Sequence, residues 1–361
     1  MEKKVIKLGV VGLNRGRDIV WNVWGHSNDF VLRAICDKNP KRLADGKKFF
    51  EEQLGAKDFL CFDNLDDLLA SDIDAVLIAT DATLHTPQAI KALNAGKHVL
   101  SEIPAINSVE EAKMLKEAVK AHPELKYMAA ENCCFWAFID SWKKMHDAGK
   151  FGDIAYAESE YLHGKNPDDF EPLPDNYWRK SYNAIKYITH NLGPLLYILD
   201  DRCVSVSCIE PDVRYNPYKT GAENGVALFR TAKGRAIRIF IGFGVYVGFD
   251  HNFAMFGTRG SIHTDRSKSF KEAHSFAKMY DIPGTFSETM EIPVTTAYDK
   301  KILNTGHGGA DTRMMQEFFK CIINDTKPPV DVDLGIAMSI PGIYAHESAL
   351  KGGQLVEIPE I

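Results

Sequence analysis

The sequence predicts an α/β protein in which a doubly wound parallel sheet is followed by an α+β domain with a large open, mostly antiparallel sheet. Three observations predict it: apolar runs alternate with helical segments through the first third, a glycine turn precedes a run that ends in an acid, and later runs alternate in polarity. The 361 residues suffice for two domains. We place these domains at residues 1–132 and 133–361.

Elements of the first domain alternate strictly, which favours parallel strands with helices on both faces. The expected strands are Lys7–Gly12, Val31–Asp37, Asp74–Thr80, Lys97–Ser101 and Lys126–Ala130. The expected helices follow Gly16, lie near Leu65–Leu69, and cover Pro87–Ala95 and Ser108–Ala121. Ser108 and Glu111 have the spacing of a capping box.

A glycine turn, Gly12-Leu13-Asn14-Arg15-Gly16, follows the first strand. Gly12 allows a tight turn, and Gly16 lets the helix lie close while its N-terminal amides face a pyrophosphate. Asn14 occupies the place of the usual second glycine, and Asn tolerates a positive φ better than other residues with a side chain. A strand–turn–helix without a ligand would look the same.

Asp37 makes the turn more informative. It ends the second strand about 20 residues after the glycines, where a carboxylate accepts hydrogen bonds from the adenosine ribose. The same carboxylate would repel a 2′-phosphate, so we expect NAD as the cofactor. Lys38 and Lys41 leave NADP open.

Composition excludes several classes of function. A formal net charge of −6 gives no basic surface for nucleic acid or an anionic membrane, and no apolar run approaches the length of a membrane span. Met1–Lys7 lacks an apolar signal core, and seven cysteines are an odd number, so we expect free thiols and a cytoplasmic location. We expect no metal, because no CxxC or HxxxH occurs.

The second domain has strand patterns with turn glycines between them. They lie at Ala155–His163, Arg202–Glu210, Asn224–Thr231, Arg235–Tyr246 and Asn252–His263. Helices are expected over Gly193–Leu199, with Pro194 in the first turn, and from Asp311 through Ile322. Because Ile237–Val247 is too apolar for a sheet wetted on both faces, we expect a homodimer or homotetramer.

Three segments resemble the glucose–fructose oxidoreductase/inositol dehydrogenase (Gfo/Idh/MocA) family. They are VVGLNRGR in the glycine turn, Ala79–Ala105 and Phe151–Tyr161. The resemblance implies a Rossmann domain followed by a domain whose open sheet often makes subunit contacts. Family dehydrogenases usually carry Glu-Lys-Pro, with a lysine that positions or deprotonates the reacting hydroxyl. Here the triplet is Glu102-Ile103-Pro104, and which residue replaces the lysine stays open.

A narrower resemblance is to a subgroup containing NAD-dependent α-N-acetylgalactosaminidases. It rests on EIPA (102–105), ENCCFW (131–136), YITHNLGP (187–194) and GHGGAD (306–311). It implies that Tyr187 and His190 are the active-site tyrosine and histidine. Such glycosidases oxidise the sugar at C3, eliminate the aglycone, add water and reduce the ring again. Other family members stop after the oxidation.

Candidate catalytic residues lie together before the predicted helix. His190 suits a base that takes a hydroxyl proton, Tyr187 a proton relay, and Lys186 a substitute for the absent lysine. Structural alternatives are a histidine that packs at the helix start, a packed tyrosine and a solvated lysine.

Candidate cofactor contacts lie where strands of the first domain end. They are Gly12, Asn14, Arg15, Gly16, Asp37, Thr80, His85, Glu102 and Asn132. Here too His85 could cap a helix, and Glu102 could be an exposed loop charge.

Candidate substrate contacts are polar and aromatic residues of the second domain, because sugars are bound by aromatic faces and a few directed polar groups. They are Tyr161, His163, Trp178, Arg179 and His307. The loop 166–179 could equally be a surface loop with a buried anchor tryptophan.

Three functions compete. The first is an NAD(H)-dependent oxidoreductase that transfers hydride at a ring carbon, C3, of a sugar or glycoside. The second is a glycoside hydrolase in which oxidation is transient, and the third is an NAD-binding sensor without catalysis. The sugar, its anomer and its aglycone stay open.

Overall fold

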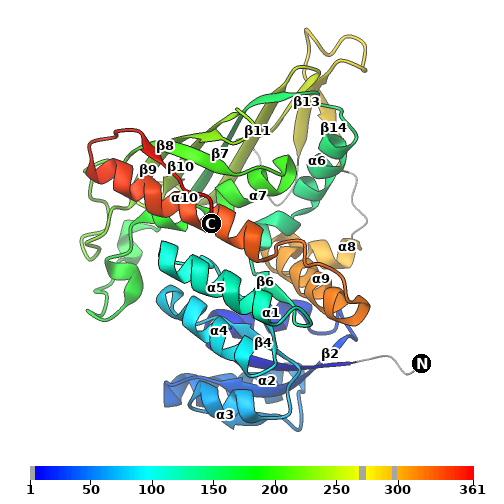
Figure 1. Cartoon of the computed structure of the whole chain (residues 1–361), viewed down its shortest axis with the longest axis vertical. Coiled ribbons are helices and arrows are strands. Elements are labelled where there is room, and N and C mark those ends of the chain that lie inside the picture. Colours follow the sequence, from blue (N-terminus) through cyan, green and yellow to red (C-terminus); the bar gives the residue numbers. More distant parts are fainter. Residues whose placement is uncertain (1–4, 268–273, 295–298) are drawn as a thin grey trace. The chain divides into compact units, whose positions relative to one another are not determined.

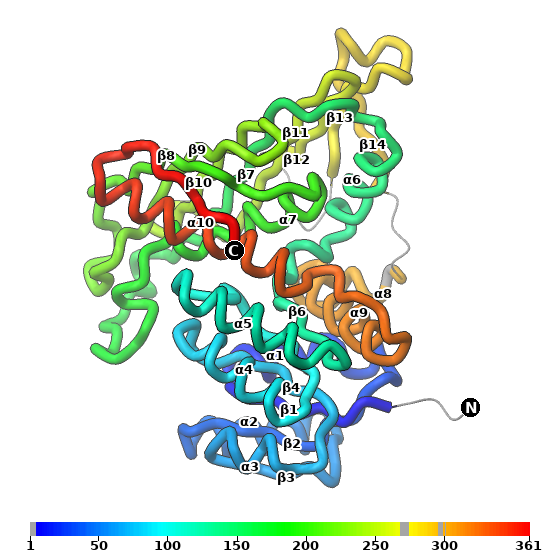
Figure 2. Tube along the Cα trace, viewed as in Figure 1, coloured from blue at the N-terminus to red at the C-terminus, as the bar shows by residue number. Residues whose placement is uncertain are grey.

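The computed structural model describes residues 5–267, 274–294 and 299–361, which form two compact units. The first unit contains Met1–Phe135 and Asp299–Ile336, and the second contains Trp136–Tyr298 and Ala337–Ile361 (Figures 1 and 2). The expected first boundary therefore lies close to the observed one. The expectation that all later residues belong to the second domain is wrong, because residues 299–336 pack with the first.

A six-stranded parallel sheet forms the centre of the first unit, in the order β3-β2-β1-β4-β5-β6. Its strands are β1 (Ile6–Val11), β2 (Phe30–Cys36), β3 (Leu60–Phe62), β4 (Ala75–Ile78), β5 (His98–Ser101) and β6 (Tyr127–Ala129). The doubly wound prediction is confirmed. β3 was not predicted, because this edge strand has only three residues and is largely exposed.

Helices connect these strands (Figure 1). They are α1 (Arg15–Val23), α2 (Pro40–Leu54), α3 (Leu65–Ala70), α4 (His85–Asn94) and α5 (Val109–Ala121), with short turns η1 (Ala82–Leu84) and η2 (Asn132–Phe135). Ser108 Oγ accepts the amide of Glu111 at 3.1 Å, as the capping box predicts. The Glu111 carboxylate accepts the amide of Asn107 at 2.7 Å, so the reciprocal bond lies one residue earlier than expected.

The returning segment contains α8 (Lys300–Leu303), η7 (Gly306–Gly309) and α9 (Ala310–Asn324). The rings of Phe30 and Phe319 stack with centroids 5.0 Å apart, and Val330 O accepts the amide of Ala129, which belongs to β6, at 2.9 Å. These contacts explain why residues so late in the chain join the first unit.

A nine-stranded sheet forms the second unit, in the order β14-β13-β12-β11-β7-β10-β9-β8-β15. Its strands are β7 (Ile154–His163), β8 (Cys203–Ile209), β9 (Asn224–Thr231), β10 (Ala236–Gly242), β11 (Phe249–Gly257), β12 (Gly260–Thr264), β13 (Ser275–Met279), β14 (Met290–Ile292) and β15 (Val356–Glu357). β7 and β10 pair in parallel and the other pairs are antiparallel, so a mostly antiparallel sheet is confirmed. The single strand expected over Asn252–His263 is wrong. The chain turns between Phe256 and Ser261, which pair across β11 and β12.

The helices of this unit are α6 (Ala137–Asp147), α7 (Thr189–Leu199) and most of α10 (Val332–Leu350), with short turns η3 (Pro167–Asp169), η4 (Trp178–Lys180) and η5 (Ala184–Tyr187). α7 packs on the sheet, because Ser159 Oγ donates to Asn191 O at 2.8 Å and Asn191 Nδ2 donates to Phe240 O at 3.1 Å. It begins earlier than predicted, so Pro194 lies inside the helix and not in its first turn. No helix in the described part of the chain has the length and apolarity to span a membrane.

Candidate functional site

The glycine turn has a shape that only glycine fits. Gly12 has φ +87°, and a Cβ there would lie 2.3 Å from the carbonyl oxygen of Ala79. A Cβ on Gly16 would lie 2.8 Å from Cγ1 of Val10, so α1 lies close to β1 as expected. Asn14 has φ −77°, so the positive φ that would explain an asparagine there falls on Gly12 instead.

Asp37 closes the same turn from the end of β2. It is 6% exposed, and its two carboxylate oxygens accept the amides of Leu13 at 3.0 Å and Asn39 at 2.9 Å. Each carboxylate oxygen has two lone pairs, so both can still accept a hydroxyl. A carboxylate fixed beside a glycine turn is suited to bind the ribose in the adenosine half of NAD.

Two other predicted cofactor contacts, His85 and Thr80, form hydrogen bonds within the first unit. His85 is 2% exposed, and its ring nitrogens lie 3.1 Å from Pro104 O and 3.2 Å from Thr80 O. The Thr80 hydroxyl donates to Gln88 Oε1 at 2.6 Å. These bonds tie together the loops that follow β4 and β5, so His85 positions these loops.

Arg15 and Glu102 form an ion pair. Arg15 Nε donates to Glu102 Oε1 at 3.0 Å, and the other Glu102 oxygen accepts the amide of Ile103 at 3.2 Å. Glu102 is 8% exposed, so it is not the exposed loop charge of the alternative reading.

Asp311, at the start of α9, is the centre of this network. Its buried carboxylate accepts hydrogen bonds from both terminal nitrogens of Arg15 and from Asn22, Asn132 and His307 at 2.6 to 2.9 Å. Burial alone would raise the pKa of Asp311, but the Arg15 charge and the hydrogen bonds from His307 and Arg15 hold it well below the usual value. Among its partners, sequence reasoning missed Asn22, and it missed the role of Asp311 itself.

His307 was predicted to contact substrate. It lies in η7 at φ +54°, and its Nδ1 is 2.9 Å from Asp311 Oδ2. The side chain is 38% exposed, so the ring both holds Asp311 and reaches solvent. Its contact with substrate stays a prediction.

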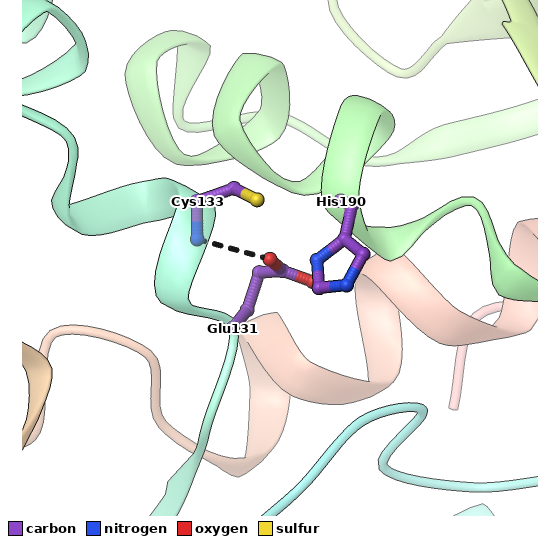
Figure 3. A group of neighbouring side chains, drawn as sticks. All are labelled: Glu131, Cys133 and His190. Carbon is purple, nitrogen blue, oxygen red and sulfur yellow. Dashed lines mark hydrogen bonds between the residues drawn. The ribbon is translucent and has the colours of Figure 1, made fainter. Parts of the chain in front are cut away.

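The segment after β6 is also buried. The Cys133 amide donates to Glu131 Oε1 at 3.1 Å, as Figure 3 shows. Burial, together with the nearby Glu131 charge, raises the pKa of the Cys133 thiol well above its ordinary value, so this thiol stays protonated near neutral pH.

The second unit brings together two of the three predicted catalytic side chains, those of His190 and Tyr187. His190 lies at the start of α7 (Figure 3), half-buried, with its ring centroid 5.1 Å from Tyr161 and 5.3 Å from Tyr187, both edge-on. The Tyr161 ring also stacks on the His251 ring, with centroids 4.4 Å apart. The tyrosines are 5% and 8% exposed, so this is a packed cluster whose more accessible member is His190.

Further aromatic rings border the cluster. Phe243 lies 5.3 Å from Tyr161 and 6.4 Å from Tyr187, while His163 is exposed and lies 5.0 Å from Phe249. The structure thus brings Tyr161 and His163 together with the catalytic candidates.

Arg179 joins this cluster from η4. Its guanidinium carbon lies 4.3 Å from the Trp178 ring centroid and 5.1 Å from that of Tyr187. Burial would lower the pKa of Arg179, but interactions with Tyr187, including a side-chain hydrogen bond, raise it. Trp178 is half-buried and lies against Arg179, so these two residues join the end of the loop to the cluster, while most of residues 166–177 are exposed.

Two lysines of the second unit are relevant to the site. Lys186 is half-buried, and within residues 5–267, 274–294 and 299–361 its amine forms no hydrogen bond or ion pair. Lys219, which sequence reasoning missed, has its Nζ 5.7 Å from the Phe243 ring centroid. No motif surrounds Lys219, so only the fold could reveal it.

Family models match most of the chain. Residues 6–130 match the model described as oxidoreductase family, NAD-binding Rossmann fold, and residues 139–263 match the GFO/IDH/MocA C-terminal domain. Residues 210–361 also match the C-terminal domain of glycosyl hydrolase 109.

Curated relatives carry the name glycosyl hydrolase family 109 protein. One from Solibacter usitatus is 26% identical over 98% of this chain and 88% of its own length. Another, from Bacteroides thetaiotaomicron, is 29% identical over 66% of this chain, and the match spans about half of that relative, 51%.

Solved structures share the fold. A levoglucosan dehydrogenase in complex with NADH and L-sorbose superposes with a TM-score of 0.84 at 20% identity, over 99% of this chain and 100% of that chain. An oxidoreductase domain protein from Kribbella flavida gives a TM-score of 0.85 at 20% identity over the same shares.

Proposed function

Because this chain belongs to the Gfo/Idh/MocA family of NAD-binding oxidoreductases, we propose that it transfers hydride at a ring carbon, C3, of a sugar or glycoside. The chain is an NAD-dependent oxidoreductase by family. The substrate, the carbon and the residues that act on it are the proposal.

The first unit supplies the residues that would hold NAD. Gly12 allows the tight turn against the backbone of Ala79, and Asp37 offers carboxylate oxygens to ribose hydroxyls. When bound, the nicotinamide supplies a hydride acceptor. The network of Arg15, Glu102 and Asp311 fixes the start of α1 against the loop after β5, which keeps the turn in one shape.

The second unit supplies the residues that would hold the sugar. Trp178 and Tyr187 present aromatic faces, and Arg179 between them is a directed donor. The levoglucosan dehydrogenase with L-sorbose bound has the same fold, which supports a sugar as the substrate class.

One observation carries the catalytic proposal: His190 is half-buried and its ring contacts two tyrosine rings, Tyr161 and Tyr187. Packing against these two rings holds the imidazole in place while leaving part of it accessible. A histidine base takes the hydroxyl proton as hydride leaves the same carbon, which the hydrophobic Ile103 cannot do. Tyr187 beside it would hydrogen-bond the same sugar.

A second candidate is redox-neutral glycoside hydrolysis. The glycosyl hydrolase 109 match over residues 210–361, and the names of the relatives, favour it. Its first step is the same oxidation at C3, which acidifies the neighbouring C2–H so that the aglycone can be eliminated. Water would then add across the C1–C2 double bond, and reduction of the C3 ketone would restore the hydroxyl group. The same side chains serve both candidates.

The test uses purified protein, a panel of nitrophenyl and methyl glycosides, and saturating NAD. Absorbance at 340 nm reports net oxidation, and released nitrophenol reports hydrolysis. For any substrate found, deuterium at C3 is compared with deuterium at C4 as the control. We expect slower turnover only with the C3 label. Sensitivity at another carbon would refute C3, and absence of both signals across the panel would refute the function.

A further inference from the structure

Two cationic side chains, those of Arg179 and Lys219, border the proposed sugar site. Arg179 lies over Tyr187, and Lys219 lies over Phe243, whose ring is 6.4 Å from that of Tyr187. Both side chains are half-buried. In the described part of the chain, neither forms an ion pair with a carboxylate within 4.0 Å.

The fold holds these two cations near each other. Lys180 O accepts the amides of Thr220 at 2.8 Å and Gly221 at 3.2 Å, so the residues next to Lys219 are bonded to the residue next to Arg179. A Cβ on Gly221 would lie 2.6 Å from the carbonyl oxygen of Ser181, which shows how closely the two segments approach.

The carboxylate of a neighbouring acid, Glu223, is already hydrogen-bonded to the backbone. Glu223 is 2% exposed, and its carboxylate accepts the amides of Tyr215 and Asn216 at 3.0 Å. Burial lowers the pKa of Lys219, Glu223 raises it and Arg179 lowers it again, so the two cations lie close enough to repel each other. Bringing two like charges together at a partly buried site is unfavourable unless an anion joins them.

Contacts with aromatic faces offset only part of the repulsion between the two cations. Trp178 and Tyr187 attract the guanidinium, and Phe243 attracts the ammonium, with contributions of modest size at partly exposed sites. A bound anion would add charge-assisted hydrogen bonds from the planar fork of Arg179 and the mobile ammonium of Lys219.

We propose that Arg179 and Lys219 together bind an anionic substituent of the substrate, so that the preferred sugar carries a carboxylate, sulfate or phosphate group. This rests on the proposed function, whose sugar site it deepens, and makes Lys219 a specificity-determining residue.

The test compares matched pairs of sugars by titration calorimetry in the presence of NADH, and by turnover with NAD. The pairs are methyl glycosides and their uronides, with sulfate and phosphate monoesters of the same sugars as separate arms that identify the anion. We expect the charged member to bind at least about tenfold more tightly, and added salt to reduce this preference.

Variants assign the preference to Lys219. Lys219→Gln should lower the ratio of charged to neutral affinity about tenfold, Lys219→Arg should largely keep it, and Lys165→Gln, a change at an exposed lysine of the same unit, should not alter it. Equal binding of both members, or loss of NADH affinity instead of anion preference in Lys219→Gln, would overturn the proposal. Charged sugars that bind preferentially but are never turned over would refute the proposed function alone. Turnover with no charge preference would refute this inference alone.

Discussion

Both terminal nitrogens of the Arg15 guanidinium donate hydrogen bonds to the Asp311 carboxylate, at 2.9 and 2.6 Å, although 296 positions separate the two residues in sequence. The bidentate pair joins the first helix after the glycine turn to the segment that returns late in the chain. Asp311 has no exposed surface. The glycine turn therefore depends on a residue far outside the nucleotide-binding motif.

Replacing Asp311 by Asn should destabilise the first unit. The change leaves Arg15 with Glu102 alone and turns an amide nitrogen toward other donors. Removing one partner of a buried ion pair costs about 3–5 kcal/mol, and the remaining Glu102 contact favours the lower end. Urea unfolding measures the change. The control Asp325→Asn removes an exposed partner of Lys126 and should cost less than about 1 kcal/mol.

The contribution of Asp311 should also depend on pH. Its pKa is held below the usual value in the folded state, so folding favours the ionised form. The stabilisation is complete above the unfolded pKa of about 4 and is lost as the pH falls below it toward the folded pKa. The difference in unfolding free energy between the unmodified protein and Asp311→Asn should shrink below about pH 4. A difference that grows there would contradict the assignment.

Gly12→Ala should weaken NAD binding and stability more than Gly96→Ala does. Both glycines have positive φ, at +87° and +73°, but a Cβ meets Ala79 only at Gly12 and has open space at Gly96. Backbone strain costs about 1–2 kcal/mol in each, and the clash at Gly12 adds about 1–3 kcal/mol. Thermal unfolding and NADH fluorescence titration would check this. Equal effects would mean that the turn relaxes freely.

Asp37 should set the preference for NAD over NADP. A charge-assisted contact with the ribose is worth roughly 1.5–3 kcal/mol, so Asp37→Asn should weaken NAD binding about ten- to a hundredfold and reduce discrimination against NADP. The asparagine keeps the size of the side chain near Leu13 and Asn39, which limits damage to the turn. Calorimetry measures the affinities for NAD and NADP. Tighter binding of NADP by the unmodified protein would refute the prediction.

Local patterns predicted local structure well. Asn224–Thr231 is a strand with the predicted bounds, because alternation and flanking glycines mark it, and Ser108 caps the helix that its spacing with Glu111 indicated. The pairing of Asp311 with Arg15 could not be predicted, since neither residue has a local pattern that points to the other. Lys219 was missed for the same reason, because its neighbours Phe243 and Arg179 come near it only in the folded unit.

The basis of the oligomer prediction changes. Ile237, Ile239 and Ile241 are buried within their own unit, so the apolar run that suggested an interface serves the core. The exposed apolar residues of the sheet include Leu228 and Val226 on the neighbouring strand β9, at 53% and 40%. We predict a homodimer or homotetramer through this face.

Leu228→Glu tests that prediction, because a charge at an interface opposes association. Light scattering at micromolar concentration should show a smaller mass for this variant and an unchanged mass for Leu350→Glu, which alters an exposed leucine at the end of α10. A monomeric unmodified protein would contradict the prediction.

The most direct test of the account is the turnover of His190→Ala with a sugar identified by the glycoside panel. The account predicts that NAD affinity and stability stay near those of the unmodified protein while turnover falls roughly 10²–10⁴-fold, the usual contribution of a general base. Lys186→Ala, which alters a neighbouring half-buried cation, should lose far less. Near-normal turnover by His190→Ala together with an inactive Lys186→Ala would contradict the account and assign the base to the lysine.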